Sequence, residues 1–202
     1  MKKGRNDNYP KKGASIKVQP IRNHKDIQAI KHALSKYPRN YCLFTMGINT
    51  AYRANELLSL TIGQVAHLKE NDILDLKQSK NKEYRPTALN GVTVSAIQHW
   101  LKYYPRTCHE HAPLFLSQHS RKALTVPALN HRVKKWCQEA GIEGNYGSHS
   151  LRKTWGYHQR TTNKASVALL MKAFAHIAEE QTLEYLCILP EEIQNLYTEM
   201  EL

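Results

Sequence analysis

The chain has 202 residues, of which 41% are hydrophobic and 23% charged, and its 29 Lys and Arg against 17 Asp and Glu give a formal net charge of +12. This composition is typical of a globular protein and excludes a disordered or fibrous chain. The absence of any run of 18 apolar residues excludes a membrane-spanning protein, and the basic N-terminus lacks the apolar stretch of a secretory signal. The cysteines are far apart without a Cys-x-x-Cys pair, which argues against a disulfide scaffold and fits a reducing cytoplasm: Cys42, Cys108, Cys137 and Cys187.

The charge is unevenly distributed along the chain. Residues 1–23 hold seven basic side chains and one acidic one, whereas residues 179–202 hold seven glutamates and no lysine or arginine. Without this acidic tail the remaining residues carry a net charge of +19. The basic residues alternate with polar and aromatic ones and form no basic amphipathic helix, so we expect the partner to be a nucleic acid and not a membrane.

In chain order, residues 1–23 read as a flexible basic arm, because they contain Pro10, Gly13 and Pro20 and few apolar side chains. Apolar spacing then predicts helices, a hairpin and a short strand. The helices cover residues 24–37, 39–49, 54–60, 91–103, 127–140, 149–161, 166–175, 179–187 and 191–200. The hairpin joins 72–77 to 83–89, and 114–116 is the short strand. We therefore expect a mostly α (α+β) fold: a helical bundle with a small antiparallel β-sheet.

Two segments in the first half carry polar side chains that call for an explanation. Arg53 directly follows a buried apolar helix, and Glu56 lies three residues later. Because an unpaired buried charge is costly, an internal Arg53–Glu56 ion pair is one interpretation. Lys80 lies at the tip of the hairpin, where a solvent-exposed lysine is the simplest interpretation.

Two further segments lie in the second half. His149 and Arg152 are three residues apart at a helix start, with Ser148 as a candidate N-cap, so they can gather donors for an anion such as phosphate. An ordinary capped basic helix remains the alternative. His176 ends a later helix and Tyr185 follows nine residues on, where a half-buried core tyrosine is the alternative to a nucleophile.

Together these residues resemble the tyrosine recombinase (phage integrase) family, from about residue 20 to residue 188. The order is Arg, Lys, His-x-x-Arg, His and then Tyr after nine residues. The family's motifs match, in turn, Arg53-x-x-Glu56-Leu57, the hairpin Lys80 with Pro86–Leu89, His149-x-Leu151-Arg152, Phe174-Ala175-His176, and Thr182-x-x-Tyr185. Each match is weak alone, but six positions in order with similar spacing make a specific signal.

The resemblance implies DNA strand cleavage and rejoining without a cofactor, a metal or ATP. Tyr185 would be the nucleophile and would form a 3′-phosphotyrosine, while Arg53, Arg152 and His176 would bind the phosphate. Lys80, or Lys82 in a shifted register, would protonate the leaving 5′-oxygen, and His149 would exchange a proton with Tyr185. Glu56 would support the site without taking part in the chemistry.

The sequence departs from the family in three respects. Lys153 follows Arg152 where the family often has His, and Phe174–Ala175 replace Leu-Gly, which could alter the turn before His176. About 20 residues precede the matched part, so the chain resembles the short integrases and the fimbrial-switch invertases, which consist of the catalytic domain alone. We expect a basic arm over 1–23, the catalytic domain over 24–189, and an acidic C-terminal helix over 190–202, exchanged between protomers or packed on its own core.

The implied partners are double-stranded DNA, further copies of the chain in a tetramer on DNA, and accessory DNA-bending proteins. The expected location is the cytoplasm, on the nucleoid, for a bacterial or phage-encoded protein. A type IB topoisomerase-like enzyme and a non-catalytic DNA-binding regulator of the same fold are the alternatives. A zinc site fails on ligand spacing, although histidines and a cysteine gather in one stretch: Cys108, His109, His111 and His119.

Overall fold

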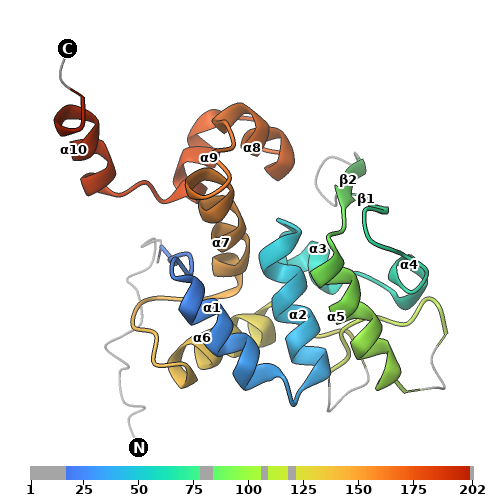
Figure 1. Ribbon diagram of the computed structural model, residues 1–202. Helices are drawn as coiled ribbons and strands as arrows, with labels where there is room; N and C mark the ends of the chain where they lie inside the picture. The colour runs from blue at the N-terminus through green and yellow to red at the C-terminus, as the bar shows by residue number, and fades with distance from the viewer. Residues whose placement is uncertain (1–16, 78–83, 106–108, 118–121, 201–202) are drawn as a thin grey trace, which may run out of the picture.

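The computed structural model of the chain describes residues 17–77, 84–105, 109–117 and 122–200. These residues are mostly helical, with one two-stranded antiparallel sheet, as the sequence predicts (Figure 1). The first half contains α1 (His24–Leu34), α2 (Pro38–Asn49), α3 (Ala54–Leu58), α4 (Ile62–Val65), β1 (Ile73–Lys77), β2 (Tyr84–Ala88) and α5 (Gly91–Lys102). The second half contains α6 (Val126–Glu139), α7 (Ser148–Thr161), α8 (Val167–Phe174), α9 (Glu179–Leu186) and α10 (Pro190–Thr198).

The element boundaries differ from the predicted ones at a few places. Pro38 is the first residue of α2, because the missing N–H of a proline is not needed in a first helical turn. The single turn α4 was not predicted, since four residues show no apolar periodicity. The predicted strand over 114–116 is wrong: Leu116 forms only an isolated bridge with Ala123. Helix α7 begins at Ser148 itself, with Gly147 and not Ser148 at the N-cap.

Helix α2 lies at the centre of the fold and packs against α1, α3, α5 and α7. Its sequence is apolar around most of its circumference, and residues 42–47 are all buried, so it is covered from several sides. Gly47 allows α7 to approach closely, because a Cβ there would lie 2.5 Å from Leu151 Cδ1. The large core of this region extends from Ile21 to Leu151 along the chain and includes Phe44, Leu57, Leu89 and Val133. We call residues 17–161 the body.

Helices α8 and α9 pack against the end of α7 through a second, smaller apolar cluster. Its buried members are Ala51, Leu170, Phe174 and Leu186. Gly156 of α7 makes this approach possible, because a Cβ at that position would lie 2.5 Å from Phe174 Cζ. We call residues 162–200, which include α8, α9 and α10, the C-terminal region (orange to red in Figure 1).

The predicted arm over residues 1–23 is wrong at its C-terminal end. Ile21 is completely buried, and its N–H donates to Thr154 Oγ1 while its carbonyl lies 3.0 Å from His158 Nε2. The N–H of Gln19 also donates to the carbonyl of Asn145. Ile21 is a single apolar residue in a mostly polar stretch, so the sequence shows no periodic pattern that would indicate its burial. Residues 1–16 lie outside the described part of the chain, so the arm stays a prediction there.

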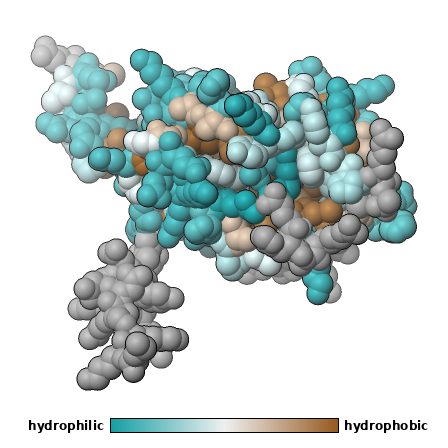
Figure 2. All heavy atoms as spheres, turned by 90° about the horizontal axis from the view of Figure 1, so that it is seen from below, coloured by the Kyte–Doolittle hydropathy of each residue, from teal (hydrophilic) through white to brown (hydrophobic). Residues whose placement is uncertain are grey.

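Helix α10 extends away from the body (Figure 1), and none of its own residues is buried. Its link to α7 is an ion pair in which both terminal nitrogens of Arg160 contact the carboxylate of Glu192. Ile193, Leu196 and Tyr197 are 50–83% exposed. The face of the molecule seen in Figure 2 is mostly hydrophilic. Within the described residues, no helix has both the length and the apolar character needed to cross a membrane.

Candidate active site

Two predicted site arginines come from different parts of the body and meet beside the C-terminal region. Arg53 is the N-cap residue of α3, and Arg152 lies in the second turn of α7. The Arg152 side chain is almost completely buried and donates to the carbonyl oxygens of Ala51 and of Phe174, the latter at 2.5 Å. Two backbone carbonyls thus fix its guanidinium plane, which is the geometry needed for forked binding of phosphate oxygens.

Glu56 holds Arg53 in place through two contacts. One carboxylate oxygen accepts from Arg53 Nη1 at 2.8 Å, and the other accepts from the Arg53 backbone N–H at 2.7 Å. The predicted internal pair therefore exists, and it leaves the side chain of Arg53 partly exposed. Burial alone raises the pKa of the Glu56 carboxyl, but the charge of Arg85 and the Arg53 donors outweigh burial and lower it below its ordinary value.

Arg85 of β2 was missed by the sequence analysis. Its Nη2 lies 3.1 Å from Glu56 Oε2, and its Nη1 donates to the carbonyls of Ala51 at 3.2 Å and Ala173 at 3.4 Å. The strand alternation offered a signal, because Arg85 pairs with Leu76 in the register and therefore shares the buried face of the hairpin. A buried arginine on an apolar face requires a partner of opposite charge, and Glu56 is that partner.

His176 lies in the turn between α8 and α9. Ala175 before it adopts the left-handed conformation with φ of +49°, where glycine is the usual residue, so the Ala-for-Gly departure keeps the turn at some cost in strain. His176 Nε2 lies 3.3 Å from Arg152 Nη2, and Nδ1 lies 3.0 Å from Thr182 Oγ1. Because Arg152 can only donate, Nε2 accepts from it and Nδ1 carries the proton of a neutral ring.

The charge around His176 sets its protonation state. Burial, together with the positive charges of Arg152, Arg53 and Arg85, lowers the pKa of His176 to about 4. The ring also stacks on Phe174, with centroids 5.0 Å apart and an interplanar angle of 16°. The ring is therefore neutral at physiological pH in the free protein. An anion bound between the arginines would offset their charge and raise this pKa.

Tyr185 of α9 and His149 of α7 form the contact with the clearest chemical meaning. Tyr185 Oη lies 2.8 Å from His149 Nδ1 of the same chain. Burial, followed by the charges of Arg152 and Lys153, lowers the pKa of His149, so its ring is neutral and Nδ1 can accept a proton. Burial raises the pKa of the Tyr185 hydroxyl, although Arg152 and Arg53 act against that shift. The phenol therefore needs a base to become a nucleophile, and His149 is in contact with it.

The structure thus brings together all but one of the predicted site residues, namely Arg53, Glu56, His149, Arg152, His176 and Tyr185. The remaining one, Lys80, and its alternative Lys82 lie outside the described residues. Cys108 and His119 of the rejected zinc site also lie outside them. Arg53, Arg85 and Arg152 outnumber the carboxylate of Glu56, so the site carries a net positive charge that suits a phosphodiester.

The sequence matches a known family and known proteins. Residues 21–192 match the profile of the phage integrase family. The Bacillus subtilis (strain 168) protein named "Probable integrase/recombinase YoeC" is 32% identical over 174 residues, which are 85% of this chain and 90% of that protein. "Tyrosine recombinase XerC" of Caldanaerobacter subterraneus subsp. tengcongensis is 26% identical over 140 residues, covering 68% of this chain and 38% of that protein.

Solved structures share the fold. The crystal structure of XerA recombinase superposes with a TM-score of 0.74 at 19% identity, covering 90% of this chain and 65% of that one. XerH recombinase bound to palindromic difH substrate in a post-cleavage complex gives 0.72 at 20% identity, covering 92% and 54%. The chain therefore spans less than two thirds of these two solved proteins. Since the family profile covers most of the chain and a relative at 32% identity matches nearly end to end, the chain belongs to the phage integrase family.

Proposed function

We propose that this protein is a site-specific DNA recombinase that cleaves and rejoins DNA strands through a 3′-phosphotyrosyl intermediate. The observation that carries the proposal is the 2.8 Å contact between Tyr185 Oη and His149 Nδ1, beside the buried guanidinium of Arg152. A nucleophile, its base and an anion-binding group meet there. The contact within one chain supports attack by Tyr185 on the phosphate bound by its own protomer.

The scissile phosphate binds between Arg53, Arg152 and His176. Each guanidinium is permanently charged and carries its N–H donors in a planar fork. The non-bridging oxygens accept from these donors, so the additional negative charge of the five-coordinate transition state is neutralised where it develops. Removing one such preorganised donor typically lowers the rate roughly 10²–10³-fold.

In the cleavage step, Tyr185 Oη attacks phosphorus and its proton passes to His149 Nδ1. The new bond joins phosphorus to Oη, the bond to the 5′-oxygen breaks, and Lys80 gives that oxygen a proton. Rejoining reverses each transfer, so the phosphotyrosyl ester conserves the bond energy and no ATP is consumed. Glu56 takes no proton and acts by fixing Arg53.

A covalent adduct tests the proposal. A pool of nicked duplexes with randomised sequence is incubated with the protein and separated under denaturing conditions, because the nick lets the cleaved end diffuse away and traps the protein on DNA. We expect an adduct with the wild type and none with Tyr185→Phe, which lacks only the hydroxyl. Tyr157→Phe is the matched control and should form the adduct normally. An adduct that persists in Tyr185→Phe would overturn the assignment.

Recombination also requires several protomers, and we propose that α10 packs on a neighbouring copy in a tetramer on DNA. The apolar side chains of Ile193, Leu196 and Tyr197 are exposed, whereas a helix packed on its own core would bury them. Deleting residues 190–202 should abolish assembly of paired DNA complexes while leaving adduct formation by single protomers. Unchanged assembly would exclude the packing of α10 on a neighbouring copy. Assembly of this kind distinguishes a recombinase from a topoisomerase-like enzyme, which relaxes DNA without a partner site.

The same proposal covers the remaining partners and the location. Residues 1–16 carry a net charge of +4 and would follow the DNA backbone, with accessory DNA-bending proteins assisting on the nucleoid in the cytoplasm. Deleting these residues, and not 1–23, leaves Ile21 in the core and isolates the effect of charge.

A further inference from the structure

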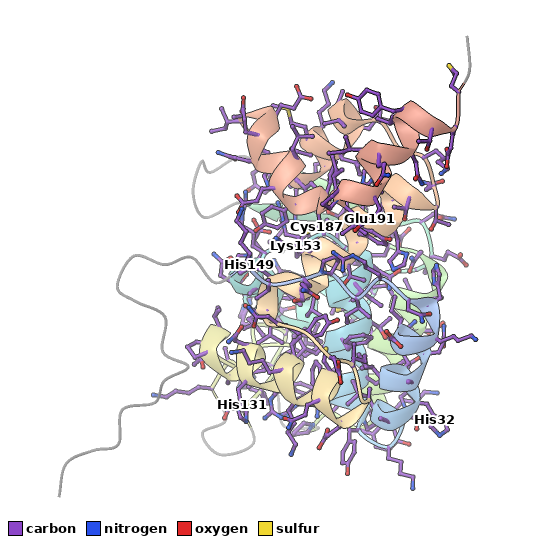
Figure 3. All side chains as sticks on the ribbon, turned by 90° about the vertical axis from the view of Figure 1, so that its left-hand side faces the viewer. His32, His131, His149, Lys153, Cys187 and Glu191 are labelled. Carbon is purple, nitrogen blue, oxygen red and sulfur yellow. The ribbon has the colours of Figure 1, made fainter. Side chains whose placement is uncertain are left out.

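Lys153 has no part in the mechanism above, although it directly follows Arg152. It lies in the second turn of α7 and is only 6% exposed. Figure 3 shows it between His149 and Cys187, which belong to α7 and to the end of α9. A lysine side chain is rarely buried to this extent, so its surroundings need an explanation.

The Lys153 ammonium contacts the segment that carries the nucleophile. Nζ donates to the carbonyl of Glu184, the residue before Tyr185, at 3.4 Å. It also lies 5.6 Å from the centroid of the Tyr185 ring, while the guanidinium carbon of Arg152 lies 5.5 Å from the same centroid. Consecutive residues of α7 therefore hold cations near one aromatic ring, and one of them binds the adjoining backbone.

Helix α9 packs on α7 and α8, but few of its side chains are buried. It has eight residues, of which only Thr182 and Leu186 are buried, and it ends at Cys187 in the left-handed conformation with φ of +50°. Thr182 contacts His176 near the middle of the helix, and Lys153 reaches its last turn. A cation at a helix C-terminus also interacts favourably with the helix dipole. Lys153 is thus a tether between the rigid α7 and the end of α9 that carries Tyr185.

We propose that Lys153 is a positioning residue that holds Tyr185 Oη on His149 Nδ1 by binding the Glu184 carbonyl and packing its ammonium on the Tyr185 ring. The inference rests on the proposed function, because it concerns the same cleavage step. Lys153 itself neither touches the phosphate nor transfers a proton.

A purely structural role predicts a different outcome. Among the described residues, no carboxylate forms an ion pair with Lys153; its partners are a carbonyl oxygen and an aromatic ring. Such a buried charge loses its hydration for modest compensation, so an uncharged side chain of similar size should not lower stability. The positioning role therefore predicts slower cleavage without lower stability, whereas a structural role predicts that both fall together.

The experiment compares Lys153→Met, which keeps the length of the side chain without its charge, with Lys153→Arg, which keeps the charge and the donors. Lys25→Met on the exposed face of α1 is the matched control for removal of one lysine charge. Single-turnover adduct formation is measured on a nicked duplex recovered from the random pool, together with the melting temperature. DNA affinity is measured in the Tyr185→Phe background, where no covalent bond forms.

For Lys153→Met we expect cleavage to be roughly tenfold slower, because one charge-assisted hydrogen bond is lost. DNA affinity should be unchanged, and the melting temperature should not be lower. Lys153→Arg should restore most of the rate, and Lys25→Met should match the wild type. Cleavage by Lys153→Met at the wild-type rate would overturn the proposal. A slower cleavage accompanied by a lower melting temperature would also overturn it, because that indicates a structural role. Slower cleavage accompanied by weaker DNA binding would overturn it too, because that indicates a DNA contact.

An NMR titration of His149 in the DNA-free protein separates this inference from the proposed function. The groups that face this ring are Arg152 and Lys153 on α7, Arg53 before α3 and Tyr185 on α9. Removing the Lys153 charge and loosening the Tyr185 contact both favour protonation, so the pKa of His149 should rise in Lys153→Met and stay unchanged in Lys153→Arg. A titration identical to that of the wild type would refute the tether, whether or not the protein cleaves DNA.

Discussion

The body and the C-terminal region are held together by very different amounts of buried structure. The body has a large continuous core around α2, whereas α8 and α9 rest on four buried side chains, and α10 buries none. The site lies across this boundary: Arg53, His149 and Arg152 belong to the body, and His176 and Tyr185 to the C-terminal region.

The site residues of the two regions are therefore held in place by different kinds of contact. The large core of the body fixes Arg53 and Arg152, which we propose to bind phosphate, and His149, the proposed base. His176 and the proposed nucleophile Tyr185 are instead held by polar contacts and the smaller apolar cluster. Arg152 binds the carbonyl of Phe174, and Arg53 and Arg85 reach the carbonyls of Ala175 and Ala173. Few apolar contacts across the boundary would let the C-terminal region open locally while the body stays folded.

The largest expected effect comes from two phenylalanines that are both completely buried, Phe44 in the body and Phe174 in the smaller cluster. Phe44→Ala should lower the free energy of global unfolding by about 3–5 kcal/mol, because it leaves a cavity in the main core. Phe174→Ala should instead detach α8 and α9 and abolish cleavage. Hydrogen exchange checks this: Phe174→Ala should lose protection in α8 and α9 but not in the body. A loss of protection as large in the body as in α8 and α9 would contradict the prediction that the C-terminal region opens separately.

The next effect concerns the ion network that joins the two regions. Glu56→Gln leaves the buried Arg85 without its charge partner and should lower the free energy of unfolding by roughly 3 kcal/mol, since the amide can still accept one hydrogen bond. Cleavage should also slow, because Arg53 loses its anchor. The control is Glu139→Gln, whose exposed pair with Lys135 is worth less than about 1 kcal/mol. Urea denaturation measures the free energy of unfolding of both variants, and equal losses would contradict the prediction.

A smaller effect is expected from two glycines at comparable helix contacts. An added Cβ would meet Leu151 at Gly47 and Phe174 at Gly156, each at 2.5 Å. Overpacking costs about 1–3 kcal/mol, partly offset by the higher helix propensity of alanine. At similar loss of stability, Gly156→Ala should slow adduct formation more than Gly47→Ala, because it displaces α8 from α7. Equal effects of the two substitutions on cleavage would contradict the prediction that the contact between α7 and α8 matters more for cleavage than the contact between α2 and α7.

The smallest effect is a pH dependence of stability. The folded protein holds the pKa of His176 near 4 through burial and three arginine charges, well below its value of about 6.5 in the unfolded chain. The unfolded chain therefore binds more protons between these values, so stability is full above pH 6.5 and falls as the pH decreases toward 4. Melting temperatures should follow this slope, and His176→Asn should make it shallower, while the lowered pKa of His149 still contributes with the same sign. An unchanged slope in that variant would refute the assignment.

The sequence predicted most helices, because their apolar residues repeat at helical spacing and their ends carry proline or glycine. It also predicted which polar residues gather at one site. It did not predict that Arg85 completes the Glu56 network, since a charged residue in a short strand resembles an exposed one until its register is known. Ile21 was assigned to the arm for a related reason: one apolar residue shows no periodicity.

By itself the sequence determined the helical class and the family, and it predicted the candidate site residues apart from Arg85, because these follow from spacing along one chain. Only the tertiary structure decided that Tyr185 meets His149 within the same chain, that Lys153 reaches the Glu184 carbonyl, and that α10 leaves its apolar face uncovered. These features depend on how α7 and α9 cross and on what each side chain meets after packing. Such contacts between residues more than 30 positions apart leave no periodic pattern in the sequence.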